Sequence, residues 1–231
     1  TYGVEVRDMC PETCNAPPDD PMRGIAVSTP NGSGPFPLFV YFAGTTVCYA
    51  AGSPLHIVQA MMQRGFVSAS IEYPQYRDYN AAYLHRKAET LASAQGPLKM
   101  LCALPKVDCS LGIASAGYSQ GSHLAVLTAQ YEPRIEAALV IAGGRPRFFN
   151  GVPYHSDLLD DDKISQFLDK SKRRSFVVVG DETFSVDSSG AANVEGARQS
   201  QKLTSGYDCG DSYDCLQSDG SGYFIIKQSD L

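Results

Sequence analysis

The sequence feature that most constrains the fold is the pentapeptide Gly-Tyr-Ser-Gln-Gly at residues 117–121. It follows an apolar run at residues 111–116 and precedes residues 122–131, where apolar side chains recur at helical spacing. A strand, a sharp turn and a helix are therefore predicted in immediate succession, with Ser119 at the turn. The glycines near this serine let the backbone turn without a clash at a Cβ atom.

The length and charge of the chain limit what it can be. Its 231 residues suffice for one α/β domain with a large core, and no linker or low-complexity stretch divides them, so we expect a single domain over residues 1–231. The net charge of −6, without long blocks of either sign, argues against a nucleic-acid partner. The sequence holds no apolar run of the roughly 18 to 20 residues that a membrane helix needs, so no membrane span is expected.

The cysteines indicate the compartment. Seven are present, and six of them form couples that are close in sequence: Cys10 with Cys14, Cys102 with Cys109, and Cys209 with Cys215. This number favours disulfides and an oxidising compartment, which predicts a secreted or extracellular protein, although spacing alone does not fix the pairing. Cys48 is left over, which predicts either a free thiol or a partner outside this sequence.

Two further patterns concern modification and metals. Asn31-Gly32-Ser33 is a glycosylation sequon in a turn-like stretch, so a glycoprotein is expected, in agreement with secretion. No Cys-x-x-Cys occurs and the four histidines are scattered along the chain, so no metal site is expected.

Strand and helix patterns alternate along the chain. Apolar runs bounded by turn residues predict strands at residues 24–30, 37–43, 66–73, 111–116, 137–142, 176–179 and 223–226. Helices are predicted from Ser53 as N-cap to Gly65, at 81–104 with a break at Gly96-Pro97, and at 122–131, 164–168 and 190–204. This alternation predicts an α/β fold with a mostly parallel central sheet flanked by helices, whose ligands bind at the carboxyl ends of the strands.

The order of these motifs resembles the α/β-hydrolase fold, on the esterase and lipase side. The resemblance begins at about residue 24 and is carried by Gly44-Thr45 after the second strand, by the pentapeptide, and by Gly180-Asp181-Glu182 after a later strand. The pentapeptide is also similar to that of cutinases and acetylxylan esterases, but the acid and histidine segments of those families are not evident. The resemblance therefore implies a single-domain α/β-hydrolase fold and a general carboxylesterase.

Within this resemblance, residues 117–121 are a nucleophile elbow, and Ser119 is the predicted nucleophile. A serine hydroxyl is a weak nucleophile, so it needs an adjacent base and an acid that orients the base. The oxyanion hole is expected to use the backbone N–H groups of Gln120 and of Thr45, or of Thr46 if the loop register differs.

The acid and the base are less well defined by the sequence. Hydrolases of this kind carry the acid about three residues after a glycine, but that position is Thr183 here. Asp181 and Glu182 are therefore equal candidates, and Asp187 is the third.

The four histidines differ in their suitability as the base. His56 and His85 lie on predicted helices and are interpreted as surface or packing residues, and His123 behind the elbow as structural. The base normally follows the last strand, so we expect a histidine beyond Leu231, in a short tail that could also hold the partner of the seventh cysteine. His155 is the alternative within the chain.

The predicted function is that of a secreted, serine-dependent carboxylic-ester hydrolase that acts through an acyl-serine intermediate. Its substrate is expected to be a small-molecule or polymer ester, and the route requires no metal or organic cofactor. The alternative is a catalytically inactive protein that uses the same fold to bind a ligand or partner.

Overall fold

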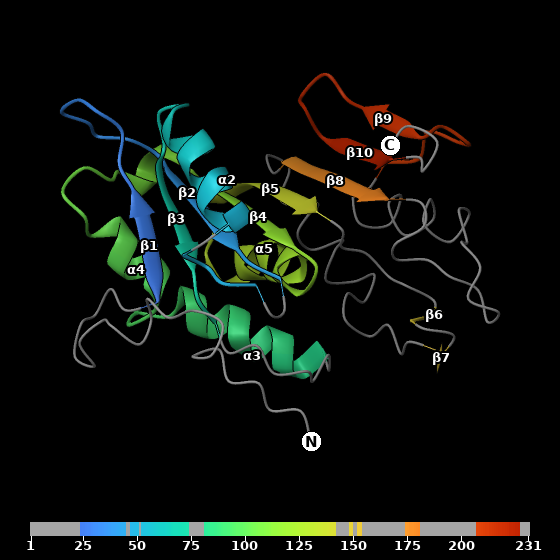
Figure 1. Ribbon diagram of the computed structural model, residues 1–231, viewed down its shortest axis with the longest axis horizontal. Helices are drawn as coiled ribbons and strands as arrows, with labels where there is room; N and C mark the ends of the chain where they lie inside the picture. Colours follow the sequence, from blue (N-terminus) through green and yellow to red (C-terminus); the bar gives the residue numbers. More distant parts are fainter. Residues whose placement is uncertain are drawn as a thin grey trace.

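The computed structural model describes residues 24–44, 47–50, 52–73, 81–141, 148–149, 152–153, 174–180 and 207–226. An eight-stranded sheet forms the centre of the molecule (Figure 1). Its order is β1 (Ile25–Ser28), β3 (Val67–Ile71), β2 (Leu38–Phe42), β4 (Ile113–Tyr118), β5 (Ile135–Ile141), β8 (Arg174–Gly180), β10 (Gly222–Ile226) and β9 (Asp214–Leu216). The strands β6 (Phe148–Phe149) and β7 (Val152–Pro153) form a separate hairpin.

The sheet is mostly parallel, as the alternation of strands and helices predicts. The six strands from β3 to β10 in this order run parallel to their neighbours. Only the outermost strands, β1 and β9, pair in the antiparallel direction. The carboxyl ends of the six parallel strands therefore lie along one edge of the sheet.

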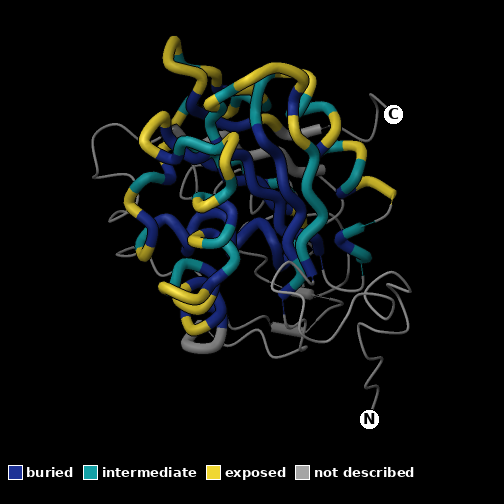
Figure 2. The backbone as a smooth tube through the Cα atoms, turned by 90° about the vertical axis from the view of Figure 1, so that its left-hand side faces the viewer, coloured by how far each residue is buried: buried dark blue, intermediate teal, exposed yellow. Residues whose placement is uncertain are grey.

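Helices cover both faces of the sheet because its central strands are apolar on both sides. In β2, Leu38, Val40 and Phe42 pack in the core under α3 (Ala81–Ala92), α4 (Pro97–Cys102) and α5 (Gln120–Tyr131). Phe39 and Tyr41 of the same strand face the smaller core under α2 (Gly52–Met62). Figure 2 shows that the central strands are buried and that the exposed positions lie at the periphery, in turns and in parts of the helices. None of the helices in the described ranges is long and apolar enough to cross a membrane.

Several element boundaries differ from the sequence-based expectation. Helix α2 begins at Gly52, so Ser53 lies inside the helix and is not its N-cap. Strand β5 begins at Ile135, two residues before the expected start, because its first residues pair with β4. The loop between Cys209 and Cys215, predicted without secondary structure, contains the start of β9. The helices predicted at 164–168 and 190–204 lie outside the described residues.

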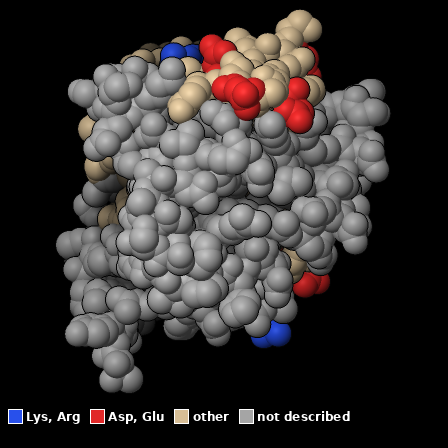
Figure 3. Space-filling view, turned by 90° about the vertical axis from the view of Figure 1, so that its right-hand side faces the viewer, with Lys and Arg blue, Asp and Glu red and all other residues tan. Residues whose placement is uncertain are grey.

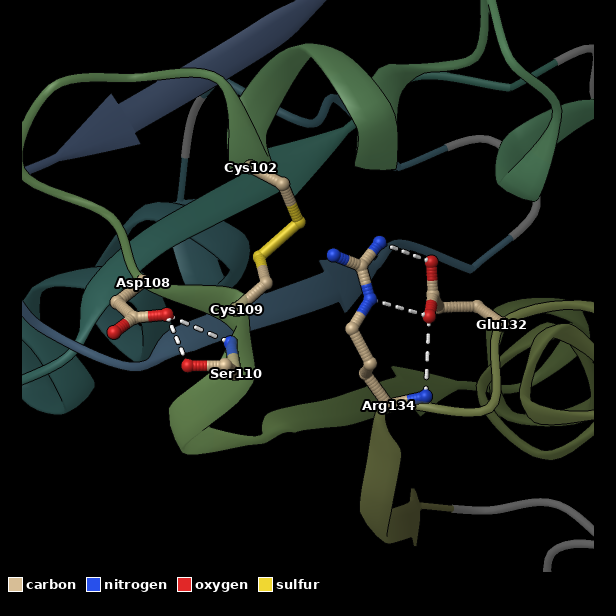
Figure 4. The surroundings of a disulfide bond; sticks show 6 residues. All are labelled: Cys102, Asp108, Cys109, Ser110, Glu132 and Arg134. Carbon is tan, nitrogen blue, oxygen red and sulfur yellow. Dashed lines mark hydrogen bonds and ion pairs between the residues drawn. A yellow bond between two sulfur atoms is a disulfide. The ribbon is translucent and has the colours of Figure 1, made fainter.

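Two of the expected disulfides are present. Cys102 pairs with Cys109 and Cys209 pairs with Cys215. The first of them joins the end of α4 to a 3-10 turn (Cys109–Leu111) that leads into β4 (Figure 4). It therefore fixes the approach to the strand that carries the elbow.

The expectation for Cys48 was wrong. Cys48 is disulfide-bonded, so it is not a free thiol and its partner does not lie outside this sequence. The other four cysteines of the described ranges pair with one another, so the partner of Cys48 lies outside those ranges. Cys10 and Cys14, predicted as a couple, are the two cysteines outside them, and the bond of Cys48 is incompatible with that couple.

The surface of the β9–β10 hairpin is acidic. Residues 207–226 contain no lysine or arginine. The exposed carboxylates of this segment gather at one end of the molecule in Figure 3, and they belong to Asp208, Asp211, Asp214 and Asp219. A charged side chain on the short edge strand β9 discourages pairing with a strand of another chain. Asn31 of the sequon is exposed in the turn between β1 and β2.

Two polar contacts stabilise the segments that lead into β4 and β5 (Figure 4). The amide and hydroxyl groups of Ser110 donate to Asp108 Oδ1 at 2.8 and 2.6 Å, and these hydrogen bonds hold the pKa of Asp108 below its usual range. After α5, Arg134 Nε and Nη2 donate to the two carboxylate oxygens of Glu132 at 2.7 and 2.6 Å. Burial alone would raise the pKa of Glu132, but the hydrogen bonds and charge of Arg134 hold it below its ordinary value.

We predict that Glu132→Gln lowers the free energy of unfolding by about 1 kcal/mol at neutral pH, a modest value because the Arg134 side chain is 38% exposed. A carboxylate with a lowered folded-state pKa stabilises the protein above its unfolded-state pKa, and this contribution is lost as the pH falls through the folded-state value. The difference in the free energy of unfolding between variant and wild type should therefore shrink below pH 4.5, the ordinary pKa of a glutamate carboxyl group. Urea unfolding at several pH values measures it. Glu136→Gln, at an exposed position of β5, is the control, and an equal pH dependence in both variants would contradict the prediction.

Candidate active site

Ser119 occupies a strained turn between β4 and α5. Strand β4 ends at Tyr118 and helix α5 begins at Gln120, so Ser119 alone connects them. Its backbone has φ 53° and ψ −120°, and among the described residues it is the only one other than glycine with a positive φ. A side chain in this region costs about 1–3 kcal/mol and persists only where the surroundings impose it. The predicted sharp turn is therefore present, and its backbone is strained at Ser119.

The two glycines of the elbow permit a direct contact between backbones. A Cβ atom on Gly117 would overlap the backbone of Gly121, and a Cβ atom on Gly121 would overlap the carbonyl groups of Phe42 and Ala43. The first turn of α5 therefore lies directly against the end of β2. Any larger residue at either position would push the helix away from the sheet.

Hydrogen bonds hold the backbone of Ser119 in place. Its N–H donates to the carbonyl oxygen of Ile141, the last residue of β5, at 3.0 Å. Its carbonyl oxygen accepts from the N–H of Ser122 at 3.0 Å and also from the Ser122 hydroxyl. Ser119 itself is half-buried, so its side chain is accessible at the edge of the sheet.

The segment after β2 runs beside the elbow. A Cβ atom on Gly44 would come within 2.7 Å of the Tyr118 ring, so the two segments are in close contact. The carbonyl oxygen of Gly44 accepts from the N–H of Val47 at 3.1 Å, which closes a tight turn. Thr45 and Thr46, the candidates for the second oxyanion donor, lie outside the described residues.

Burial suppresses the ionisation of a tyrosine beneath this segment. Tyr41, in β2, is 3% exposed, and its burial, together with the proximity of Tyr118, raises its pKa to about 12. Tyr41 is therefore neutral at physiological pH and acts as a packing residue of the core under α2.

The register of the sheet defines where the acid and base segments emerge. Tyr118, Ile141, Val178 and Phe224 form one row across β4, β5, β8 and β10. Strands β8 and β10 end two residues beyond this row, at the same edge as Ser119. Asp181 and Glu182 follow β8 directly, but they lie outside the described residues, as do Asp187 and His155.

Three of the four histidines are placed by the structure. His56 is exposed on α2. His85 is 9% exposed on α3, where its Nδ1 lies 3.2 Å from the Tyr131 hydroxyl of α5. His123 is 7% exposed within α5. These three positions agree with the surface, packing and structural roles expected from the sequence. Within the described ranges, no group of three or more metal-ligating side chains occurs.

The sequence did not reveal a buried lysine behind the elbow. Lys87 of α3 is 6% exposed, and its Nζ donates to Oε1 of Gln120 at 3.1 Å. The same ammonium lies 5.6 Å from the ring centroid of Tyr73, whose hydroxyl donates to the carbonyl oxygen of Ala43. The available signal was the position of Lys87 in the apolar stripe of the helix, between Leu84 and Leu91.

Comparisons with known proteins agree with this architecture. No protein-family model and no curated protein sequence matches the chain. Among solved structures, Est1E from Butyrivibrio proteoclasticus is 13% identical, with a TM-score of 0.57 over 88% of this chain and 84% of its own. A putative α/β hydrolase from Agrobacterium tumefaciens is 14% identical, with a TM-score of 0.55 over 88% of this chain and 79% of its own. The chain has the α/β-hydrolase fold.

Another structure with this fold has a different length. A CE15 glucuronoyl esterase from Teredinibacter turnerae is 10% identical, with a TM-score of 0.56 over 90% of this chain and 65% of its own. The α/β-hydrolase fold predicted from the pentapeptide and the alternation of elements is thus confirmed. At these identities the likeness concerns the arrangement of the backbone, so the chemistry has to be argued from the residues of this chain.

We predict that Ser119→Gly is more stable than Ser119→Ala by about 1 kcal/mol, because both lack the hydroxyl but only glycine tolerates the positive φ without strain. Urea unfolding of the two variants measures this difference. Ser110, an exposed serine of the 3-10 turn, is the matched control, because there alanine should be the more stable replacement. The same order of stability at both positions would show that the backbone of Ser119 carries no special strain.

Proposed function

We propose that this α/β-hydrolase-fold protein is a serine-dependent carboxylic-ester hydrolase with Ser119 as its nucleophile. The observation that carries the proposal is the strained backbone of Ser119 at the half-buried corner between β4 and α5. Strain of this kind is retained at functional sites, where it presents a side chain that an ordinary turn would not. The esterases among the structural neighbours support the class of reaction.

The surroundings of Ser119 suit the stabilisation of an oxyanion. Gln120 is the first residue of α5, a helix of 12 residues whose positive dipole end lies at the elbow. In the proposed site the backbone N–H of Gln120 and that of Thr45 donate to the oxygen that becomes negative during the reaction. The contact between Gly121 and the end of β2 supports this pairing, because it brings the two segments together.

The reaction follows from these roles in two steps. The Ser119 Oγ attacks the ester carbonyl carbon while the base takes its proton. The bond from the acyl carbon to the alcohol oxygen then breaks, and the base returns the proton to the departing alcohol. Water attacks the acyl-serine in the same way, which releases the carboxylic acid and restores the hydroxyl of Ser119.

The topology supports a division of the remaining roles between the ends of β8 and β10. Asp181 or Glu182 follows β8 and is the proposed acid. A histidine that follows β10 beyond Leu231 is the proposed base, with His155 as the alternative. The two disulfides of the described residues suit a protein of an oxidising compartment, in agreement with a secreted enzyme that acts on small-molecule or polymer esters.

We predict that a fluorophosphonate probe labels Ser119 and that the protein hydrolyses p-nitrophenyl acetate. Labelling is located by mass spectrometry of the digested protein. Ser119→Ala should lose the label and at least about 1,000-fold in kcat, because the proposed acyl intermediate forms on the Ser119 hydroxyl. Ser110→Ala, which removes an exposed serine outside the elbow, should retain both the labelling and the kcat of the wild type.

The same assay tests the alternatives. Absence of both labelling and hydrolysis in the wild-type protein would contradict the proposal and favour a binding protein with a hydrolase fold. In an active enzyme, His155→Ala separates the two candidate bases. Retained activity in this variant assigns the base to the segment after β10, and its loss assigns it to His155.

A further inference from the structure

A buried polar cluster lies directly behind the elbow. It consists of Lys87 of α3, Gln120 of α5 and Tyr73, which follows β3, and these three side chains are 6%, 1% and 2% exposed. A buried ammonium group is costly unless hydrogen bonds or the face of an aromatic ring compensate for its lost hydration. Here Lys87 Nζ donates to Gln120 Oε1 at 3.1 Å and lies 5.6 Å from the ring centroid of Tyr73. The cluster is therefore a specific arrangement of groups that would be unfavourable apart.

The cluster connects the two sides of the proposed oxyanion hole. Gln120 supplies the backbone N–H that follows the nucleophile. Tyr73 donates its hydroxyl to the carbonyl oxygen of Ala43, which precedes Thr45 by two residues in the sequence. Lys87 contacts both Gln120 and the ring of Tyr73, so a single side chain from α3 connects the ends of β4 and β2.

We propose that Lys87 is a positioning residue of the oxyanion hole. It keeps the Gln120 side chain, and with it the first peptide group of α5, at a fixed distance from the end of β2. Preorganised donors are effective only when they are held where the negative charge develops, and a small displacement of a donor lowers the rate while ground-state binding persists. This inference rests on the proposed function, because it assigns Lys87 a role only if Ser119 is acylated.

A cavity beside Lys87 provides a way to test its ammonium group. The cavity has a volume of about 230 Å³ and is lined by Glu72, Tyr73, Arg86, Lys87, Thr90, Leu91 and Pro97. Truncation of Lys87 to alanine removes three carbon atoms and the nitrogen, which together correspond to n-propylammonium. This ion can reach the vacated space through the adjoining cavity.

The first experiment compares Lys87→Met with the wild type in the hydrolysis of p-nitrophenyl acetate. Methionine matches the unbranched stem of the lysine side chain as far as Cε but lacks the ammonium group, and with it the charge and the donor. We expect kcat to fall by about 10- to 100-fold while KM changes by less than about threefold. The melting temperature should fall, because the buried Gln120 Oε1 loses its Lys87 donor, so kcat is compared at a temperature at which both proteins are folded. Arg86→Met, at an exposed position lining the same cavity, should behave as the wild type.

The second experiment is chemical rescue of Lys87→Ala. Millimolar n-propylammonium should restore kcat by at least about fivefold, whereas 1-propanol, of similar shape but uncharged, should not. Arg86→Ala treated with the same amine controls for direct attack of the amine on the acyl-enzyme. Tyr73→Phe, which removes the hydrogen bond to Ala43, should also lower kcat without a matching change in KM.

The outcomes separate this inference from the proposed function. Wild-type kcat in Lys87→Met, or a loss in proportion to the unfolded fraction, would overturn the role of Lys87 while leaving Ser119 as the nucleophile. Equal effects of the amine and the alcohol would also overturn it. An inactive, unlabelled wild-type protein would overturn both proposals. The labelling and activity of the wild type are therefore measured before the Lys87 variants are compared.

Discussion

The candidate site depends on the contact between the backbone of Gly121 and the carbonyl groups of Phe42 and Ala43. Two backbones can approach this closely only when one of them lacks a Cβ atom. The contact places the positive end of α5 against the end of β2, and Gly117 allows β4 to pass beneath the same helical turn. The chain then has a single residue with which to change direction from strand to helix. The strain at Ser119 is thus a consequence of the close packing on either side of it.

Helix α3 holds α5 at both of its ends. Lys87 binds Gln120 at the first residue of α5, and His85 contacts Tyr131 at its last residue. Hydrogen bonds require a particular geometry, whereas apolar contacts tolerate sliding and rotation. The apolar core between these helices supplies most of the stabilisation, and the two polar contacts define the rotation and register of α5 relative to the sheet. The orientation of the elbow is in this way linked to a helix distant from it in sequence.

Features set by local sequence could be predicted, and features set by packing between distant segments could not. Strand β2 was recognisable because both of its faces are apolar, and the elbow because its glycines and serine have a fixed spacing. Strand β9 was not, since it has only three residues and alternates exposed with buried positions too briefly to form a pattern. Ser53 was misplaced because a serine near a helix start does not reveal which residue begins the helix.

The same limit applies to the site. The cluster of Lys87, Tyr73 and Gln120 joins three elements, and its existence depends on how α3 packs against α5. A lysine in an apolar helical stripe can equally extend its side chain to solvent, so the sequence alone cannot distinguish the two arrangements. Cys48 illustrates a related limit: spacing suggests which cysteines are neighbours in the chain, but a bond between cysteines distant in sequence leaves no such pattern.

The spacing of the strands constrains how an acid after β8 can act on Ser119. Strands β4 and β8 are separated by β5, so with neighbouring strands about 4.8 Å apart their ends lie roughly 10 Å from each other. This separation is too large for a direct hydrogen bond between a carboxylate and the serine hydroxyl. An imidazole with a nitrogen on each side can bridge it, one nitrogen facing the acid and the other the serine. In the proposed mechanism, Asp181 or Glu182 therefore orients a histidine and does not deprotonate Ser119 itself.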